Sequence, residues 1–215
     1  MADVSRETTV IEQEPTVAVE ALFGPRADLA RQYAASLAAY GEERGLIGPL
    51  ELPRLWTRHV LNCAAAAPLF SGRVGDVGSG AGLPGLVLAI ARPDVEWVLI
   101  ETMERRVAWL AEQVQDLGLE NVEIVRSRAE DWMGAGTLDA VTARAVSALR
   151  TLIPLTAPLV RDAGELILLK GANAQAEIAA AEKVIRRFRL SDVRVETVGA
   201  ALLAEPTRVI RATVR

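Results

Sequence analysis

The sequence is poor in the side chains that most often bind metals or form covalent links. Cys63 is the single cysteine and His59 the single histidine among 215 residues. One cysteine excludes an internal disulfide, and one cysteine with one histidine argues against a zinc site of the usual Cys/His type. A Ser–His–Asp hydrolase would depend on His59 alone, and no Gly-x-Ser-x-Gly elbow accompanies it. We therefore expect no metal and a reducing, cytoplasmic location.

Lysine is scarce, and so are long hydrophobic runs. Lys170 and Lys183 are the only lysines among 24 basic residues, which face 28 acids and leave a net charge of −4. This balance excludes a generic polycation that binds any nucleic acid, although local arginine clusters allow a selective RNA partner. The longest charge-free apolar stretch, residues 77–91, is rich in glycine and shorter than the ~18 residues of a membrane span. We expect no membrane contact.

What is present is a globular composition whose pattern changes near residue 73. Hydrophobic residues make up 51% and charged residues 24%, which excludes wholesale disorder. Residues 1–20 carry acids without an apolar period, which indicates a flexible acidic tail. Helices are predicted at 26–40 and 52–69, so we expect residues 21–72 to form an N-terminal helical cap. Residues 73–215 are expected to form the main domain.

Strands and helices alternate from residue 73 onward. Strands are predicted at 73–77, 96–100, 122–125, 138–142 and 164–169, with helices at 84–91, 103–117, 147–160 and 175–188. Thr102 is the expected N-cap of the helix at 103–117. The closing strands, 193–198 and 208–214, lack an intervening helix and should pair antiparallel at one edge. The alternation predicts an α/β fold with a mostly parallel, doubly wound sheet.

The most informative segment is Asp76-Val77-Gly78-Ser79-Gly80-Ala81-Gly82-Leu83-Pro84-Gly85, which leaves the first strand and enters a helix. Residues 78–85 are called the glycine loop below. Glycines allow a ligand to approach the backbone closely, and such a turn lies in the ligand crevice of a doubly wound sheet. The segment also satisfies Gly-x-Gly-x-x-Gly, so a nicotinamide dinucleotide site is an alternative. Against it, Asp76 would repel a pyrophosphate, and the chain is too short for a second dinucleotide half.

S-adenosylmethionine fits the glycine loop better than a dinucleotide does. It carries a sulfonium, an ammonium and only one carboxylate, so the Asp76 carboxylate would favour it. Glu101 closes the second predicted strand, where an acid can accept hydrogen bonds from both ribose hydroxyls. The sequence therefore predicts a cofactor site at the ends of the first two strands.

Further motifs, in order, resemble those of one methyltransferase family. They are Arg58-His59-Val60-Leu61-Asn62, Arg126-Ser127-Arg128-Ala129-Glu130, Ala143-Arg144-Ala145-Val146 and Leu169-Lys170-Gly171. With the glycine loop they resemble the small-subunit (16S) ribosomal RNA guanine-N7 methyltransferase G family, also called glucose-inhibited division protein B, over roughly residues 24–215. The resemblance implies a class I S-adenosylmethionine-dependent, Rossmann-like fold with a seven-stranded sheet. It also implies methyl transfer to N7 of one guanine in the decoding-region hairpin of 16S ribosomal RNA, giving 7-methylguanosine.

The glycine loop and the resemblance together assign roles to individual residues. Cofactor binding is expected of Asp76, Gly78, Ser79, Gly80, Gly82, Leu83, Glu101, Ala129, Glu130 and Arg144. Arg144 and Lys170 are expected to position the substrate, because guanine N7 has a free lone pair and needs no general base. RNA contacts are expected of Arg58, His59 and Arg128. A salt-bridged rim lysine is the alternative for Lys170, and a satisfied helix histidine is the alternative for His59.

The net acidity predicts that free RNA is a poor substrate. The expected partner is therefore 16S ribosomal RNA within a small ribosomal subunit or an assembly intermediate, bound by a monomer. One alternative is a methyltransferase of the same fold that acts on a small molecule or a protein and has no need of Arg144 or Lys170. Another is a cofactor-binding ribosome assembly factor without catalysis, which would bind the particle and form no product.

Overall fold

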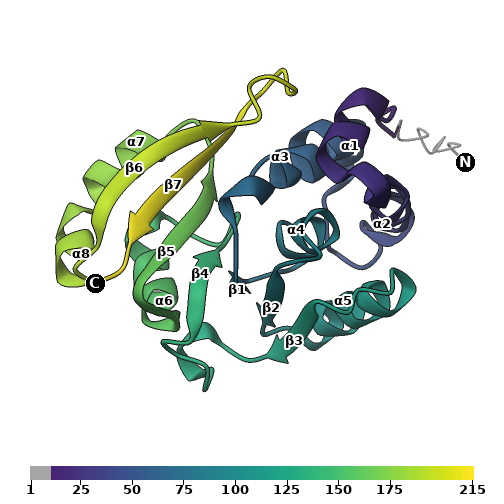
Figure 1. The fold of residues 1–215 in the computed structure, drawn as a ribbon. Helices are drawn as coiled ribbons and strands as arrows, with labels where there is room; N and C mark the ends of the chain where they lie inside the picture. The colour runs from purple at the N-terminus through teal and green to yellow at the C-terminus, as the bar shows by residue number, and fades with distance from the viewer. Residues whose placement is uncertain (1–10) are drawn as a thin grey trace, which may run out of the picture.

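The computed structural model describes residues 11–215, and a seven-stranded sheet forms its centre (Figure 1). The strands in this part of the chain are β1 Arg73–Val77, β2 Glu96–Glu101, β3 Val122–Arg126, β4 Leu138–Thr142, β5 Val160–Lys170, β6 Ser191–Val198 and β7 Thr207–Thr213. Their order in the sheet is β3-β2-β1-β4-β5-β7-β6. The first five are parallel, and β7 is antiparallel to both β5 and β6. The predicted doubly wound sheet with antiparallel closing strands is confirmed.

Helices before β1 pack together at one side of the sheet (Figure 1). They are α1 Thr16–Phe23, η1 Gly24–Arg26, α2 Ala27–Tyr40, η2 Pro49–Arg54, η3 Leu55–Val60, α3 Leu61–Ala64 and η4 Ala67–Leu69. Those that follow β1 are α4 Gly85–Ala91, α5 Glu104–Asp116, η5 Ala129–Asp131, α6 Leu149–Thr156, η6 Ala157–Leu159, α7 Ala174–Ala180 and α8 Glu182–Arg187. None of these helices has the length and apolar character needed to cross a membrane.

Helices pack against both faces of the sheet through apolar side chains. The fold therefore has three layers, with the sheet between two layers of helices. One buried cluster joins the N-terminal helices, α4 and α5 to the face that carries Val74 and Leu99. The other joins α6, α7 and α8 to the face that carries Val77 and Ile100. Because side chains alternate along a strand, both faces of the central strands are apolar, as expected for a parallel sheet between helices.

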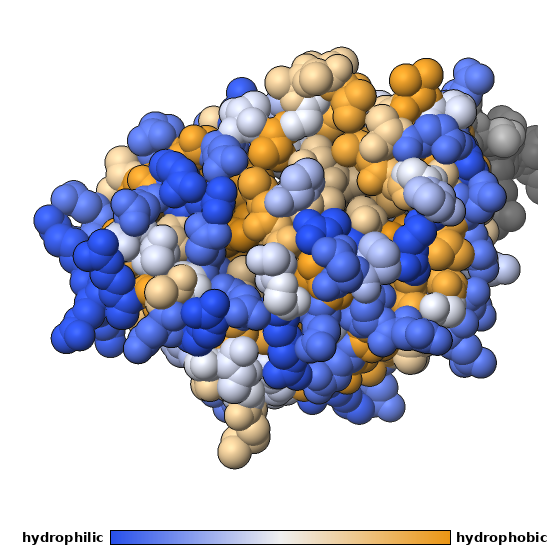
Figure 2. Space-filling model, viewed as in Figure 1, coloured by the Kyte–Doolittle hydropathy of each residue, from blue (hydrophilic) through white to orange (hydrophobic). Residues whose placement is uncertain are grey.

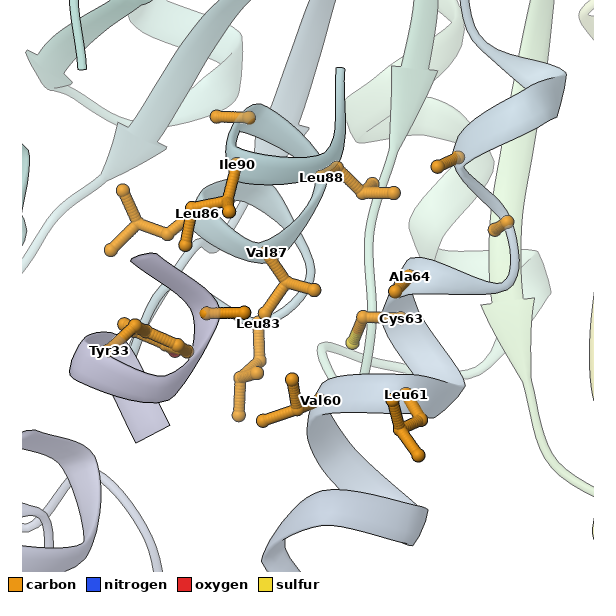
Figure 3. Packing of buried hydrophobic residues seen from close by; sticks show 14 of the residues in the cluster. Tyr33, Val60, Leu61, Cys63, Ala64, Leu83, Leu86, Val87, Leu88 and Ile90 are labelled. Atoms are coloured by element: carbon orange, nitrogen blue, oxygen red, sulfur yellow. The ribbon is translucent and has the colours of Figure 1, made fainter. Parts of the chain in front are cut away.

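The N-terminal helices share their core with the main domain. Val60 and Cys63 face Leu83 of the glycine loop and Val87 of α4, and Tyr33 lies beside them (Figure 3). Cys63 is fully buried, and burial raises the pKa of its thiol to about 11. The thiol therefore acts as a small apolar filler.

Several predicted boundaries were wrong. The helix predicted at 52–69 is a succession of short helices, η2 to η4, because Pro53 and Pro68 lack an amide donor. α1 begins at Thr16, so residues 16–20 of the predicted tail are helical, and residues 1–10 lie outside the described residues. The N-cap of α5 is Met103 rather than Thr102.

The later helices also differ from their predicted ranges. The helix predicted at 147–160 starts at Leu149 and ends in η6, and β5 begins at once with Val160. The helix predicted at 175–188 divides at Ala181 into α7 and α8.

Candidate active site

The shape of the glycine loop depends on three glycines with positive φ. The φ angles of Gly78, Gly80 and Gly82 are +74°, +55° and +98°, a region that other residues rarely adopt. A Cβ on Gly78 would lie 2.9 Å from a Val146 methyl, and one on Gly82 would lie 2.4 Å from Leu86. A Cβ on Gly80 would meet no heavy atom closer than 3.7 Å. Space therefore stays open over the centre of the loop.

The Asp76 side chain, at the end of β1, holds the glycine loop through the Gly85 amide. Its carboxylate is fully buried, and Oδ2 accepts a hydrogen bond from the Gly85 amide at 3.0 Å. Burial raises the pKa of this carboxyl to about 7. Oδ1 has no hydrogen-bond partner among the described residues. An unpartnered carboxylate oxygen beneath the loop suits a cationic ligand.

Glu101 ends β2 and binds three backbone amides. Oε2 accepts from the Gly80 amide at 2.9 Å, while Oε1 accepts from Thr102 and Met103 at 2.8 and 2.9 Å. Arg106 lies 3.8 Å from Oε2. The Thr102 hydroxyl also donates to Oε1, at 3.3 Å. Oε2 accepts from the Gly80 amide alone, so this oxygen can fix the loop and still accept from a ribose hydroxyl.

The carbonyl of Ala81, within the glycine loop, accepts hydrogen bonds from two neighbouring helices. The buried hydroxyl of Tyr33, in α2, donates to this oxygen at 3.0 Å. The indole N–H of Trp109, in α5, donates to the same oxygen at 2.8 Å. Two helices thus fix one loop carbonyl, which leaves the loop little freedom to change its conformation.

The other predicted cofactor residues lie within the loop or after β3, and they differ in burial. Ser79 is buried, and its hydroxyl donates to the Asp76 carbonyl at 2.9 Å. Leu83 is buried against the N-terminal helices (Figure 3). Ala129 and Glu130 follow β3 within η5, with Ala129 buried and Glu130 exposed. η5 therefore stands at the same edge of the sheet as the loop.

A pocket of about 1020 Å³ opens where β4 and β5 end. Val146 lines it and also occupies the position that a Gly78 Cβ would need, so the pocket adjoins the glycine loop. Arg128, expected to contact RNA, is exposed beside η5 and outside this pocket. The charged or titratable residues of the lining are Glu51, Arg58, His59, Arg144, Lys170, Glu177, Glu205 and Arg208.

Arg144 reaches into the pocket from the turn after β4. Its backbone bridges to Leu169 of β5, and the following Ala145 has φ of +56°. One guanidinium nitrogen donates to the Arg58 carbonyl at 3.1 Å, and another donates to Nδ1 of His59. The other ring nitrogen, Nε2, lies 2.6 Å from a Glu51 carboxylate oxygen. The structure thus brings Arg58, His59 and Arg144 together.

Lys170, at the end of β5, is an ion-paired residue of the pocket wall. Nζ donates to the Ser147 carbonyl at 2.8 Å and to Glu177 at 2.9 Å. The same Glu177 oxygen accepts from the Leu149 amide, at the start of α6. Two of the three ammonium hydrogens are therefore engaged, which matches the rim-lysine alternative and leaves one for a substrate.

Sequence reasoning missed several residues of this site. Arg208 lines the pocket from β7, and Glu51 lines it from η2. Tyr33 contacts the glycine loop from α2. Asn62 lies in a motif that the sequence singled out, and its carbonyl accepts from Thr207 at 2.7 Å. These contacts join distant segments, so no local spacing indicates them.

Solved structures with the same architecture define the fold class. TYW2 from M. jannaschii, in complex with AdoMet, has a TM-score of 0.55 at 18% identity and covers 74% of this chain and 76% of that chain. A SAM-dependent O-methyltransferase from Thermotoga maritima has a TM-score of 0.53 at 19% identity, covering 71% and 64%. The fold is that of the class I S-adenosylmethionine-dependent methyltransferases, with helices before the sheet.

Sequence comparison narrows this class to one family. The family model GidB, rRNA small subunit methyltransferase G, matches residues 26–205. The ribosomal RNA small subunit methyltransferase G of Leifsonia xyli subsp. xyli is 65% identical over 97% of this chain and 100% of its own length. That of Clavibacter sepedonicus is 61% identical, covering 97% and 99%. The chain therefore belongs to the rRNA small subunit methyltransferase G family, which confirms the resemblance and the S-adenosylmethionine-dependent enzyme class.

The residues around the glycine loop fit S-adenosylmethionine. Open space over Gly80, the unpartnered Asp76 oxygen and the remaining acceptor position of Glu101 suit its backbone contacts, positive charges and ribose. No group of three or more His, Cys, Asp or Glu side chains that would hold a metal occurs in residues 11–215.

Proposed function

We propose that the protein transfers a methyl group from S-adenosylmethionine to N7 of a guanine in the decoding-region hairpin of 16S ribosomal RNA. The observation that carries this proposal is a pocket with Arg144 and Lys170 in its wall, directly beside the glycine loop. The pocket has room for a nucleobase and carries cations for the phosphates or O6 of a nucleotide.

Of the four proton-accepting side chains that line the pocket, three already have hydrogen-bond partners, which fits a substrate atom that needs no deprotonation. Both ring nitrogens of His59 are engaged, and Glu51 and Glu177 are each held by hydrogen bonds. Guanine N7 carries a free lone pair, so its methylation needs alignment and exclusion of water rather than a general base.

Each part of the site has a distinct task. Gly78, Gly80 and Gly82 would hold the methionine part of the cofactor and Glu101 its ribose, while η5 would border the adenine. The bound cofactor supplies an electrophilic methyl group on a sulfonium. Arg144 would hold a phosphate or guanine O6 and stay off N7, because the guanine ring gains positive charge as N7 is methylated.

The RNA is proposed to be presented by a small ribosomal subunit or an assembly intermediate, in the cytoplasm, to a monomeric enzyme. Hydrophilic residues gather over the side of the molecule that carries β6 and α8, where Arg186 and Arg187 end the helix (Figure 2). The net charge of −4 nevertheless disfavours binding to arbitrary RNA. Contacts with an assembled particle would supply the missing affinity.

The test uses labelled cofactor and small subunits that lack native modifications, with the product nucleoside identified by mass spectrometry. We expect 7-methylguanosine at one site in 16S RNA. The Arg144 guanidinium contacts Arg58 and His59, so the structure favours its substrate role over the expected cofactor contact. Arg144→Ala should therefore keep cofactor affinity and lose turnover, and retention of turnover within about threefold, ~0.7 kcal/mol, would remove the arginine from the site. Modification of a small molecule or protein instead would support the same-fold alternative, and cofactor and particle binding without product would indicate an assembly factor.

A further inference from the structure

The geometry points to Glu51 as a positioning residue that acts through His59 to orient the guanidinium of Arg144. Three side chains from separate segments form a continuous hydrogen-bonded chain. Glu51 lies in η2 and His59 in η3, while Arg144 follows β4. Glu51 Oε2 lies 2.6 Å from His59 Nε2, and Arg144 bonds the other ring nitrogen. All three line the pocket beside the glycine loop.

The donors and acceptors in this chain fix the tautomer of His59. A guanidinium only donates, so Nδ1 must present its lone pair to Arg144. An ionised carboxylate only accepts, so Nε2 must carry the proton that is donated to Glu51. The imidazole is therefore neutral, with its proton on Nε2. In the opposite tautomer an N–H would face the guanidinium and a lone pair would face the carboxylate.

This arrangement orients Arg144 without neutralising it. Within residues 11–215 no carboxylate forms an ion pair with Arg144, and its side-chain partners are the Arg58 carbonyl and the His59 ring. A carboxylate in direct contact would compete with a phosphate for the same fork of N–H groups. Because Glu51 is placed on the far side of the imidazole, Arg144 keeps its charge for the RNA.

The charges around His59 favour the neutral ring. Burial, Arg144 and Arg58 lower the pKa of His59 below its ordinary value of 6.5, while Glu51 acts in the opposite direction. Lys170 and Arg208 add positive charge to the same pocket, and Glu177 and Glu205 add negative charge. A protonated ring could not accept from Arg144, so the orientation of the guanidinium should fail at acidic pH.

One test needs no enzyme activity, because His59 is the only histidine. Selective 15N-histidine labelling gives the ring signals of this residue alone. We expect a neutral ring protonated at Nε2, with a pKa below 6.5. Glu51→Ala should lower that pKa further and Arg144→Ala should raise it. A ring protonated at Nδ1, or shifts of the same sign in the two variants, would overturn the inference.

A second test measures the coupling between Glu51 and Arg144 from their effects on turnover. This test rests on the proposed function. Glu51→Ala should lower kcat on small subunits about tenfold, the effect of one hydrogen bond to a charged group. KM for the cofactor should stay unchanged. In an Arg144→Ala background the same substitution should change kcat by less than about twofold. An undiminished effect in that background would show that Glu51 does not act through Arg144.

Arg54→Ala is the matched control. Arg54 pairs with Oε1 of Glu51 at 2.8 Å and leaves the Oε2 contact with His59 in place. We expect wild-type kcat for this variant, and a loss equal to that of Glu51→Ala would point to a general effect of surface charge. If no substrate is methylated by the wild type, the NMR test still decides the inference, so its failure is distinct from failure of the proposed function.

Discussion

Gly80 differs from the other glycines of its loop because a Cβ there would meet no heavy atom of residues 11–215 closer than 3.7 Å. Gly80→Ala should therefore fold, with a cost of about 1–2 kcal/mol for an alanine at φ of +55°. The added methyl group projects into the space assigned to the cofactor, so calorimetry should show at least a tenfold loss of S-adenosylmethionine affinity.

Gly118→Ala is the control for this effect. Gly118 follows α5 at φ of +59°, and a Cβ there meets no atom within 4 Å. The variant carries the same backbone penalty away from the site, and its cofactor affinity should equal that of the wild type. Equal affinity in Gly80→Ala would contradict the assignment of the loop.

Asp76 makes stability depend on pH. Its pKa is about 7 in the folded protein, against an ordinary value of 3.8. The folded state therefore holds the proton more tightly, and this group's contribution to the free energy of unfolding falls as pH rises from about 4 to 7. Asp76→Asn keeps a carbonyl acceptor for Gly85 and removes the charge.

Thermal melts of both proteins without cofactor, at intervals from pH 4 to 8, measure the effect. The melting temperature of Asp76→Asn should rise relative to wild type across this range and level off above pH 7, by an amount equivalent to at most about 4 kcal/mol. Parallel curves would show that Asp76 does not titrate in this way.

Individual site residues were predictable where they stand at a strand end or in a family motif. Asp76 and Glu101 were found by the first rule, and Arg144 and Lys170 came from motifs that carry the resemblance. In the structure they lie at or just after the ends of β1, β2, β4 and β5. Glu51 was not predicted, because its contact with His59 depends on how η2 packs against η3. The hydrogen bond from the Gly80 amide to Glu101 was not predicted either, because it depends on the shape of the glycine loop.

At the scale of the elements, helix α2 also restrains the glycine loop. Its Tyr33 hydroxyl is one of two donors to the Ala81 carbonyl. Tyr33→Phe should weaken cofactor binding severalfold and cost about 1 kcal/mol of stability, because the loop loses one of its two restraints. Tyr40→Phe, an exposed position at the end of the same helix, should change neither quantity. Unaltered cofactor affinity in Tyr33→Phe would mean that Trp109 alone holds the loop.

Strands were easier to predict than helices. β1 and β4 have the predicted bounds, because short apolar runs between polar turns leave few alternatives. The segment 52–69 has a helical apolar period, yet it forms several short helices of different type. Periodicity detects which face is buried and does not distinguish a continuous helix from a broken one, whereas the position of proline does.

At the scale of the whole molecule, β7 brings Arg208 from near the end of the chain to the pocket. This exposed arginine is suited to a phosphate. Arg208→Ala should weaken binding of small subunits severalfold and reduce the slope of log affinity against log salt by about 1. Cofactor affinity should not change.

Arg187→Ala, on α8 and outside the pocket, is the comparison for Arg208→Ala. Filter binding at several salt concentrations separates the two variants. If Arg187→Ala gave the same loss, the RNA would lie along α8 rather than across the pocket.

The hydrogen bond from Trp109 to the Ala81 carbonyl makes the fluorescence of this tryptophan sensitive to the glycine loop. The indole is buried, with the Arg44 guanidinium 5.4 Å from its ring, so its emission depends on a polar contact and a nearby charge. A rearrangement of the glycine loop would change that contact and hence the fluorescence, and subtraction of a Trp109→Phe spectrum would isolate the signal. The loop therefore has its own fluorophore, whose emission reports any change in the Ala81 contact without a label.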